Sequence, residues 1–122
     1  MARVRSKDTE PELAVRREVH AAGFRYRLHG KTLPGTPDLV FPRSSVAVFI
    51  NGCFWHGHNC EDGTRPASNT DYWNAKINRN IARDRRNAAA LRRKGWRVIV
   101  IWTCRLEGGT KRLLALLREL NQ

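Results

Sequence analysis

The segment of residues 51–60, NGCFWHGHNC, constrains the fold more than any other part of this chain. It holds two of the three cysteines, and the third, Cys104, lies far downstream. Cys53, His58, Cys60 and Cys104 together are candidates for the thiolate and imidazole ligands of a tetrahedral structural zinc site. A zinc ion bound by all four side chains would hold two distant parts of the chain together.

The proposed ligand set has alternatives. Spacing alone leaves His56 and His58 as competing candidates for the histidine ligand. Without a metal, the same positions would be three free cysteines in the interior and one histidine at the surface. The odd number of cysteines disfavours a disulfide framework and indicates a reducing, intracellular compartment. Because the zinc set uses every cysteine in the chain, we favour zinc.

The charge of the chain points to a polyanionic partner. A net charge of +12 and a pI near 11.0 make DNA or RNA the first candidate, and a merely basic surface is the alternative. No apolar run approaches the roughly 20 residues of a membrane-spanning helix, so no membrane association is expected. The 122 residues are expected to form one domain, residues 1–122.

Hydrophobic periodicity and turn signals predict seven elements in the order α-β-β-β-α-β-α. The expected fold is therefore α/β, with a small mixed sheet flanked by helices. The continuously apolar strand 46–50 is expected to lie beside strand 97–102. This arrangement would bring Cys104 to the segment of residues 51–60, which we call the Cys/His loop. Trp96 and Trp102 are assigned to the core. The predicted elements are a helix that begins at Thr9 and ends at Gly23, strands 24–28, 38–41 and 46–50, a helix at 70–94, a strand at 97–102 and a helix at 110–120.

Three side chains are candidates for phosphodiester chemistry. Asp38 stands at the mouth of an apolar strand, where a carboxylate could hold Mg²⁺ against a phosphate, although it could also cap a turn. Glu12 could bind metal-bound water, although Thr9 and Glu12 also read as a helix capping box. If His58 binds zinc, His56 is free to transfer protons.

Aromatic and basic residues suggest contacts with nucleic acid. Phe54 and Trp55, with Trp73, could form a wedge that enters a base stack, or they could pack as a small core around the metal. Along helix 70–94 the apolar residues define one face, and a basic stripe lies opposite. The stripe would bind phosphates without reading sequence, although charged runs are usually solvated. It comprises Lys76, Arg79, Arg83 and Arg86.

Several motifs together resemble the very-short-patch repair (Vsr) endonucleases, a family of T:G mismatch endonucleases. The resemblance runs from about Val4 to Leu120, and its most specific part is the GCFWH segment with the trailing His-x-Cys. The matching motifs are Thr9-x-x-Glu12, LPGTPD at 33–38, GCFWHGH-x-C at 52–60, the helix with Trp73, Lys76, Asn80 and RDRR at 83–86, and GWRV at 95–98.

The resemblance implies a fold similar to type II restriction endonucleases, with a variant PD-(D/E)xK core that lacks the usual lysine. It also implies Mg²⁺-dependent nicking of the strand 5′ to the thymine of a T:G mismatch, which arises when 5-methylcytosine is deaminated. Asp38 would be the central metal-binding carboxylate, and the backbone carbonyl of Ile50 would contact the same ion. His56 would act on water, and Glu12 would support the site.

The same resemblance assigns the remaining residues. It makes His58 the zinc ligand, with the three cysteines, and makes Phe54, Trp55 and Trp73 the aromatics that intercalate beside the mismatch. It implies a monomer at the nucleoid of the bacterial cytoplasm, with mismatch-repair proteins as candidate partners.

This chain departs from the best-known member at two positions. Ile50 and Asn51 replace a threonine and a histidine just before the Gly-Cys pair. Asn51 cannot act as an imidazole acid, but its amide can donate a hydrogen bond to a phosphate or leaving oxygen. Two other functions stay open: a related nuclease for other mismatches, modified bases or phage defence, and a zinc-braced DNA-binding module without catalysis.

Overall fold

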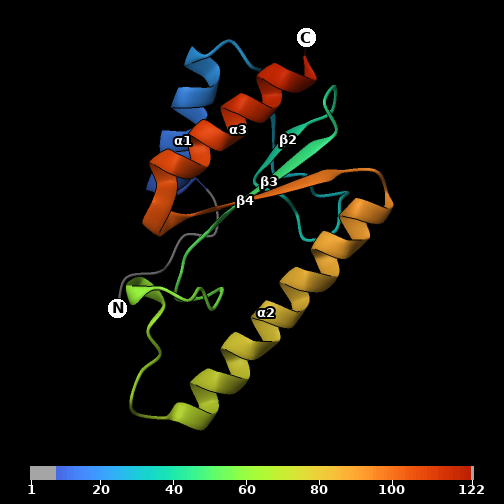
Figure 1. Ribbon diagram of the computed structural model, residues 1–122. Helices are drawn as coiled ribbons and strands as arrows, with labels where there is room; N and C mark the ends of the chain where they lie inside the picture. Colours follow the sequence, from blue (N-terminus) through green and yellow to red (C-terminus); the bar gives the residue numbers. More distant parts are fainter. Residues whose placement is uncertain (1–7, 122) are drawn as a thin grey trace.

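The computed structural model describes residues 8–121, and its elements follow the predicted order (Figure 1). The start of the family resemblance, at Val4, lies outside the described residues. Within the described part of the chain, no helix is long and apolar enough to cross a bilayer. The elements are α1 (Glu10–Ala21), β1 (Arg27–Leu28), β2 (Leu39–Phe41), β3 (Val46–Asn51), η1 (Glu61–Gly63), α2 (Thr70–Arg93), β4 (Arg97–Trp102), η2 (Thr103–Arg105) and α3 (Leu106–Leu120).

The four strands form one mixed sheet in the order β1-β2-β3-β4. Strands β1, β2 and β3 are antiparallel neighbours, whereas β3 and β4 are parallel. Parallel neighbours need a long crossover, and α2 supplies it. In the β3–β4 register Asn51 pairs with Trp102, so both strands end at the same edge of the sheet. The predicted adjacency of these strands is confirmed.

Helices cover both faces of the sheet. Helices α1 and α3 pack side by side over one face, and α2 runs along the other and extends beyond the sheet (Figure 1). The apolar residues of β2 and β3 alternate between these two layers, as expected for a sheet that is buried on both faces. The core between the sheet, α1 and α3 contains Val15, Val19, Leu39, Phe41, Val46, Val48, Ile101, Leu113 and Leu117.

Two predicted boundaries were wrong. The strand expected at 24–28 is reduced to Arg27–Leu28, because the register that pairs Arg27 with Val40 would place Arg25 opposite Pro42, which has no N–H to donate. The last helix begins at Leu106 and not at residue 110. Gly109 lies inside this helix. A Cβ at residue 109 would stand 2.7 Å from the Ile101 side chain, so glycine at this position permits close packing of α3 on β4.

Candidate active site and metal cluster

One cavity of about 840 Å³ opens beside the ends of β2 and β3. Its walls come from α1, the two strand ends, the Cys/His loop and the middle of α2. All four residues predicted to be catalytic line this cavity, although they come from different elements, and so does Ile50. They are Glu12, Asp38, Asn51 and His56.

Asp38 reaches the cavity from the residue just before β2. The ladder between β2 and β3 begins at the Leu39–Val48 pair, so the Ile50 N–H has no strand partner there. It donates instead to Asp38 Oδ2 at 2.7 Å. Burial, assisted by the neighbouring Glu12, raises the pKa of Asp38 from its ordinary value near 3.8 to about 7, against the lowering effect of the Ile50 hydrogen bond. The two carboxyl groups therefore share a poorly hydrated space.

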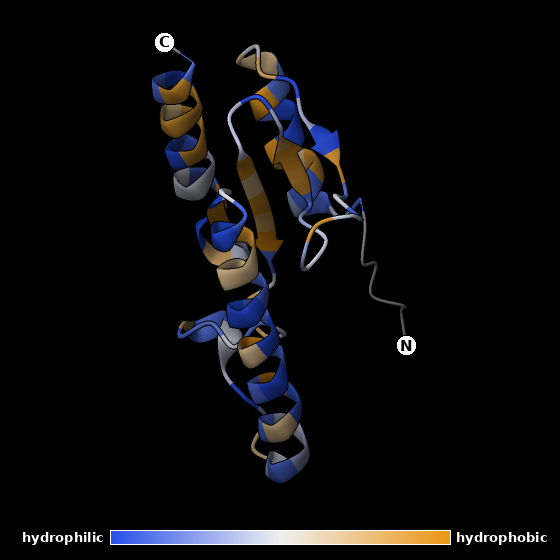
Figure 2. Cartoon of the chain, turned by 90° about the vertical axis from the view of Figure 1, so that its right-hand side faces the viewer, coloured by the Kyte–Doolittle hydropathy of each residue, from blue (hydrophilic) through white to orange (hydrophobic). Residues whose placement is uncertain are grey.

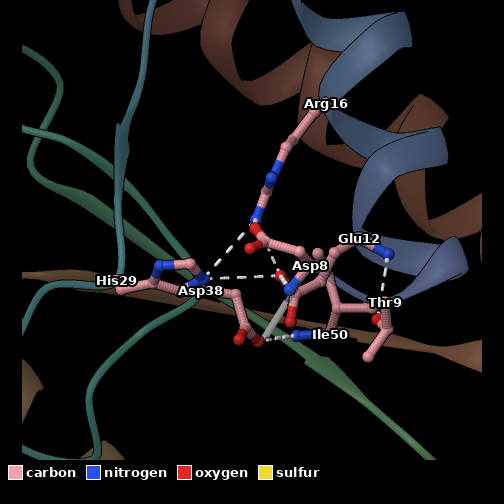
Figure 3. Close-up of polar contacts among 7 residues, drawn as sticks. All are labelled: Asp8, Thr9, Glu12, Arg16, His29, Asp38 and Ile50. Atoms are coloured by element: carbon pink, nitrogen blue, oxygen red, sulfur yellow. Dashed lines mark hydrogen bonds and ion pairs between the residues drawn. The ribbon is translucent and has the colours of Figure 1, made fainter. Parts of the chain in front are cut away.

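Glu12 is buried, with 3% of its surface exposed, and it belongs to both the helix cap and the cavity. Only one of the two hydrogen bonds of the predicted capping box is formed: Thr9 Oγ1 accepts from the Glu12 N–H at 3.4 Å. The Glu12 carboxylate turns instead to the N–H of Asp8, at 3.1 Å. It also meets Arg16 at 2.8 Å and His29 at 3.5 Å (Figure 3).

His56 is oriented by Asp84, a residue of the RDRR motif to which the sequence analysis gave no role. Its Nδ1 lies 2.6 Å from Asp84 Oδ2 on α2, and both side chains line the cavity. A carboxylate on Nδ1 fixes the orientation of the ring and leaves Nε2 for proton transfer. The available signal was that Asp84 is the one acidic residue within the arginine-rich part of that helix.

Gly57 brings the loop close enough to α2 for this contact. Its φ is +64°, in the region that favours glycine. A Cβ at residue 57 would stand 2.4 Å from Ile81 Cδ1 and 2.9 Å from Ile77. His56 therefore points toward α2, and His58, one residue beyond the glycine, belongs to the cysteine cluster.

The four predicted zinc ligands meet in space. Their ligand atoms all lie within 4.8 Å of one another, so Cys53, His58, Cys60 and Cys104 form a group that could hold a metal ion. The His58 ring stacks on Trp102, with centroids 4.1 Å apart and an 11° interplanar angle. Trp102 therefore supports the cluster, and its assignment to the core was wrong, since it is half-buried.

The thiols of this cluster differ in acidity. Burial opposes ionisation of Cys53, but hydrogen bonds led by that of Thr103 lower its pKa to about 7. Desolvation and the neighbouring thiols raise the pKa of Cys104 to about 11. The negative charge of one ionised cysteine thus opposes ionisation of the next, and a bound cation would offset this repulsion.

The aromatic residues form one cluster beside the cavity. The Phe54 ring lies 5.0 Å from the Trp55 ring and 5.3 Å from the Trp73 ring, and the two tryptophans are 5.9 Å apart. Tyr72 joins them at 5.1 Å from Trp73. Trp55 and Tyr72 are exposed, at 37% and 58%, so the cluster is also open to solvent.

The residues predicted to form the basic stripe lie on α2, whose surface is largely hydrophilic (Figure 2). Arg79, Arg83 and Arg86 are exposed, and Arg83 also lines the cavity. Lys76 stands about two helical turns before Arg83 and so lies on the same side of α2. It is half-buried, and its Nζ lies 5.9 Å from the centroid of the Trp55 ring.

Comparison with known proteins identifies relatives over most of the chain. A sequence model of the family described as DNA mismatch endonuclease Vsr matches residues 1–62. The type II nicking enzyme V.XorIIP of Xanthomonas oryzae is 57% identical over 87% of this chain and 78% of its own length. The type II nicking enzyme V.NmeAIP of Neisseria meningitidis is 44% identical over 99% and 89%. The DNA mismatch endonuclease Vsr of Escherichia coli is 37% identical over 91% and 71%.

Proposed function

The chain belongs to the DNA mismatch endonuclease Vsr family and is a DNA endonuclease that acts as a nickase. We propose that it nicks the strand 5′ to the thymine of a T:G mismatch by Mg²⁺-dependent hydrolysis. The observation that carries the proposal is the convergence of Glu12, Asp38 and His56 on one cavity. That cavity has Arg83 and the exposed Trp55 on its walls, as a site for a distorted duplex requires.

Asp38 and its surroundings fit a divalent cation. The pKa of Asp38 is raised because its carboxyl is desolvated and lies near a second carboxyl group, and a cation relieves this kind of charge accumulation. Asp38 and the Ile50 backbone carbonyl would hold Mg²⁺, a hard ion that prefers oxygen ligands. When bound, the ion would polarise the scissile phosphate and lower the pKa of water.

The other residues of the cavity would divide the remaining work. His56 Nε2 would accept a proton from the attacking water, and Asp84 on Nδ1 would stabilise the resulting imidazolium. The Asn51 amide would donate a hydrogen bond to a phosphate oxygen. The hydrolysis adds water across one P–O bond, so that the 3′ oxygen leaves with a proton and a 5′-phosphate is left.

The Cys/His cluster fits a structural zinc ion. Tetrahedral bonds of about 2.3 Å to sulfur and about 2.0 Å to nitrogen place the two ligand atoms about 3.5 Å apart, and Cys104 Sγ lies 3.5 Å from His58 Nδ1. With four protein ligands the ion has no open position for substrate. Its role would be to hold the loop that carries His56, Phe54 and Trp55.

We further propose that residues 1–122 act as one monomeric domain with a variant restriction-endonuclease-like core. The mixed sheet with helices on both faces supports this fold. A single nick requires one active site, which a monomer provides. For a chromosomal substrate the enzyme would act at the nucleoid of the bacterial cytoplasm, where mismatch-repair proteins are candidate partners.

A panel of labelled duplexes tests the substrate. The panel contains T:G, every other mismatch, modified cytosines and the matched T:A duplex, each with and without Mg²⁺. We expect one nick 5′ to the mismatched thymine, only with Mg²⁺ and only in T:G. Equal cutting of several mismatches or modified bases would favour the broader nuclease, and binding without any cutting would favour the DNA-binding module.

Removal of the zinc ion is expected to destabilise the loop and the fold together. Cys104→Ala removes one of four ligands, and the loss of about 2 kcal/mol or more of metal-linked stability would lower the Tm by about 10 °C. Thermal unfolding with and without a chelator measures this loss, and metal analysis should find one zinc per chain. A wild-type protein without stoichiometric zinc, or with a Tm that is insensitive to chelation, would refute the structural role.

Trp55→Ala is expected to weaken binding to the T:G duplex. Stacking of one base on an aromatic ring contributes about 1–3 kcal/mol, which corresponds to roughly tenfold or more in Kd. Fluorescence anisotropy with Ca²⁺ in place of Mg²⁺ measures binding without cutting. Leu28→Ala, which removes a comparably exposed apolar side chain outside the cavity wall, is the control and should bind normally. Equal Kd values for Trp55→Ala and wild type would contradict the wedge.

A further inference from the structure

Arg16 places a positive charge in the interior behind Glu12. It stands one turn after Glu12 on α1, and only 8% of its surface is exposed. The same nitrogen, Nη2, lies 2.8 Å from Glu12 Oε2 and 2.8 Å from Asp8 Oδ1. It is also 3.4 Å from His29 Nε2 (Figure 3). This charged cluster consists of Asp8, Glu12, Arg16 and His29, and two of its members, Glu12 and His29, line the cavity.

The other members of this cluster contact one of the two carboxylate oxygens of Glu12, Oε2. The Asp8 N–H, Arg16 Nη2 and His29 Nε2 all meet Oε2. None of these three contacts uses Oε1, and Glu12 lines the cavity together with Asp38. The cluster thus fixes one oxygen of Glu12 in the wall of the cavity that also contains Asp38, the residue proposed to hold Mg²⁺.

A second metal ion is a less suitable explanation of the cluster. Ligand atoms of Asp8, Glu12 and His29 lie within 4.8 Å of one another, as they would around an ion. Arg16 Nη2 lies within 2.8–3.4 Å of an atom from each of the three, so the guanidinium already fills the position of a cation. The arrangement is also a costly way to stabilise a helix, because well-packed apolar residues are often as stable as a buried ion pair.

We propose that Arg16, assisted by His29, is a positioning residue that fixes the Glu12 carboxylate toward the Mg²⁺ site at Asp38. The inference rests on the proposed function of that site and assigns to this chain a residue pair that acts on the cation through Glu12. Charge-assisted hydrogen bonds of this kind are short and directional, and partners behind a metal site commonly set its affinity for the ion.

The sign of the effect separates positioning from simple electrostatics. A fixed positive charge repels a second cation, so if Arg16 acted only through its charge, its removal would strengthen Mg²⁺ binding. If Arg16 holds Glu12 in place, its removal weakens Mg²⁺ binding by about tenfold to a hundredfold, as is typical for such partners.

The test compares three variants of the full chain. Arg16→Met removes the charge and keeps most of the aliphatic stem, whereas Arg16→Lys keeps a charge that can reach Glu12 Oε2, since all of the contacts use one nitrogen. Arg17→Met is the control, because it removes the same charge from an exposed neighbouring position on α1. Mn²⁺ binding, followed by electron paramagnetic resonance, and the half-saturating Mg²⁺ concentration for nicking are both measured.

We expect Arg16→Met to weaken both measurements by at least about tenfold, Arg16→Lys to recover most of the loss, and Arg17→Met to match wild type. In a Glu12→Gln background, Arg16→Met should have no further effect, because Arg16 acts through Glu12. Unchanged or tighter Mn²⁺ binding by Arg16→Met would overturn the proposal. If Arg16→Met does not fold, His29→Gln should show a smaller shift in the same direction, and normal Mn²⁺ binding by His29→Gln would overturn the proposal.

The wild-type protein and the Arg16→Met variant distinguish failure of the proposed function from failure of the positioning role. A wild-type protein that neither binds Mn²⁺ nor nicks the T:G duplex would contradict the proposed function itself. A wild-type protein that does both, with an Arg16→Met variant that responds to Mg²⁺ as wild type does, would contradict only the positioning role.

Discussion

Asp38→Asn should reduce nicking of the T:G duplex by at least about a thousandfold, because a metal ligand supplies several kcal/mol of transition-state stabilisation. The same substitution should stabilise the metal-free protein at neutral and higher pH. The two results together would mark a residue that is kept for chemistry at the expense of the fold. Nicking rates and chemical unfolding, measured on the same protein preparations, test both.

The direction of the stability effect follows from the pKa of Asp38. Desolvation raises this pKa from near 3.8 to about 7 in the folded chain. Between these pH values the folded state holds a proton that the unfolded chain has already released, so stability falls as the pH rises through this window. Above about pH 7 the folded chain bears an ionised Asp38 in poorly hydrated surroundings, and the neutral amide of the Asp38→Asn variant would remove that cost.

The control for this prediction is Asp71→Asn. Asp71 is exposed in the first turn of α2, outside the cavity wall, and its replacement should leave the nicking rate close to that of wild type. Unfolding is compared at about pH 5 and about pH 8 in the absence of metal. Wild-type nicking by Asp38→Asn would exclude Asp38 as the metal ligand. A metal-free Asp38→Asn that is less stable than wild type at the higher pH would contradict the desolvation argument.

His56→Ala is expected to lower the nicking rate by about 10²–10⁴-fold, the usual contribution of a positioned general base. Asp84→Asn should lower it by a smaller factor, because an amide in place of the carboxylate at 2.6 Å no longer stabilises the protonated ring. Mg²⁺ dependence should be unchanged in both variants. Single-turnover nicking at saturating Mg²⁺ measures the rates.

Added imidazole distinguishes lost chemistry from lost structure. If His56 transfers protons, free imidazole should restore part of the activity of His56→Ala and none of that of Asp38→Asn. His20→Ala, which removes an exposed histidine from α1, should nick as wild type does. A His56→Ala variant with wild-type rates would remove the imidazole from the mechanism.

Much of the fold could be predicted because its signals are local. The apolar run at 46–50 predicted a buried strand, and the periodicity of residues 70–94 predicted a long helix; the structure has β3 at Val46–Asn51 and α2 at Thr70–Arg93. The boundary errors had tertiary causes that no local pattern reveals. The β1 ladder stops where its partner strand reaches a proline, and α3 runs through Gly109 because the glycine packs on Ile101.

Site residues could be predicted from the sequence where the residue type, such as cysteine, has few possible roles. They could not be predicted where the role depends on contact with a residue from another helix or loop. Cysteines that converge with a histidine have few alternatives to metal binding, and the four predicted ligands do meet. Asp84 and Arg16 were missed because a charged residue on a helix usually faces solvent. Asp84 meets His56 only because the loop approaches α2. Arg16 meets Glu12 on its own helix, but its contact with His29 depends on the packing of another segment against α1.

The ion held at Asp38 and the imidazole of His56 are proposed to act on one and the same phosphate. Sulfur in place of one nonbridging oxygen at the proposed nick tests it directly, because Mg²⁺ binds sulfur poorly and softer Mn²⁺ binds it better. We predict that one of the two sulfur diastereomers is nicked slowly with Mg²⁺ and is restored by Mn²⁺. We also predict that His56→Ala remains slow on both diastereomers with either ion. Equal nicking of both diastereomers with Mg²⁺, or no rescue by Mn²⁺, would contradict a metal ion on that phosphate.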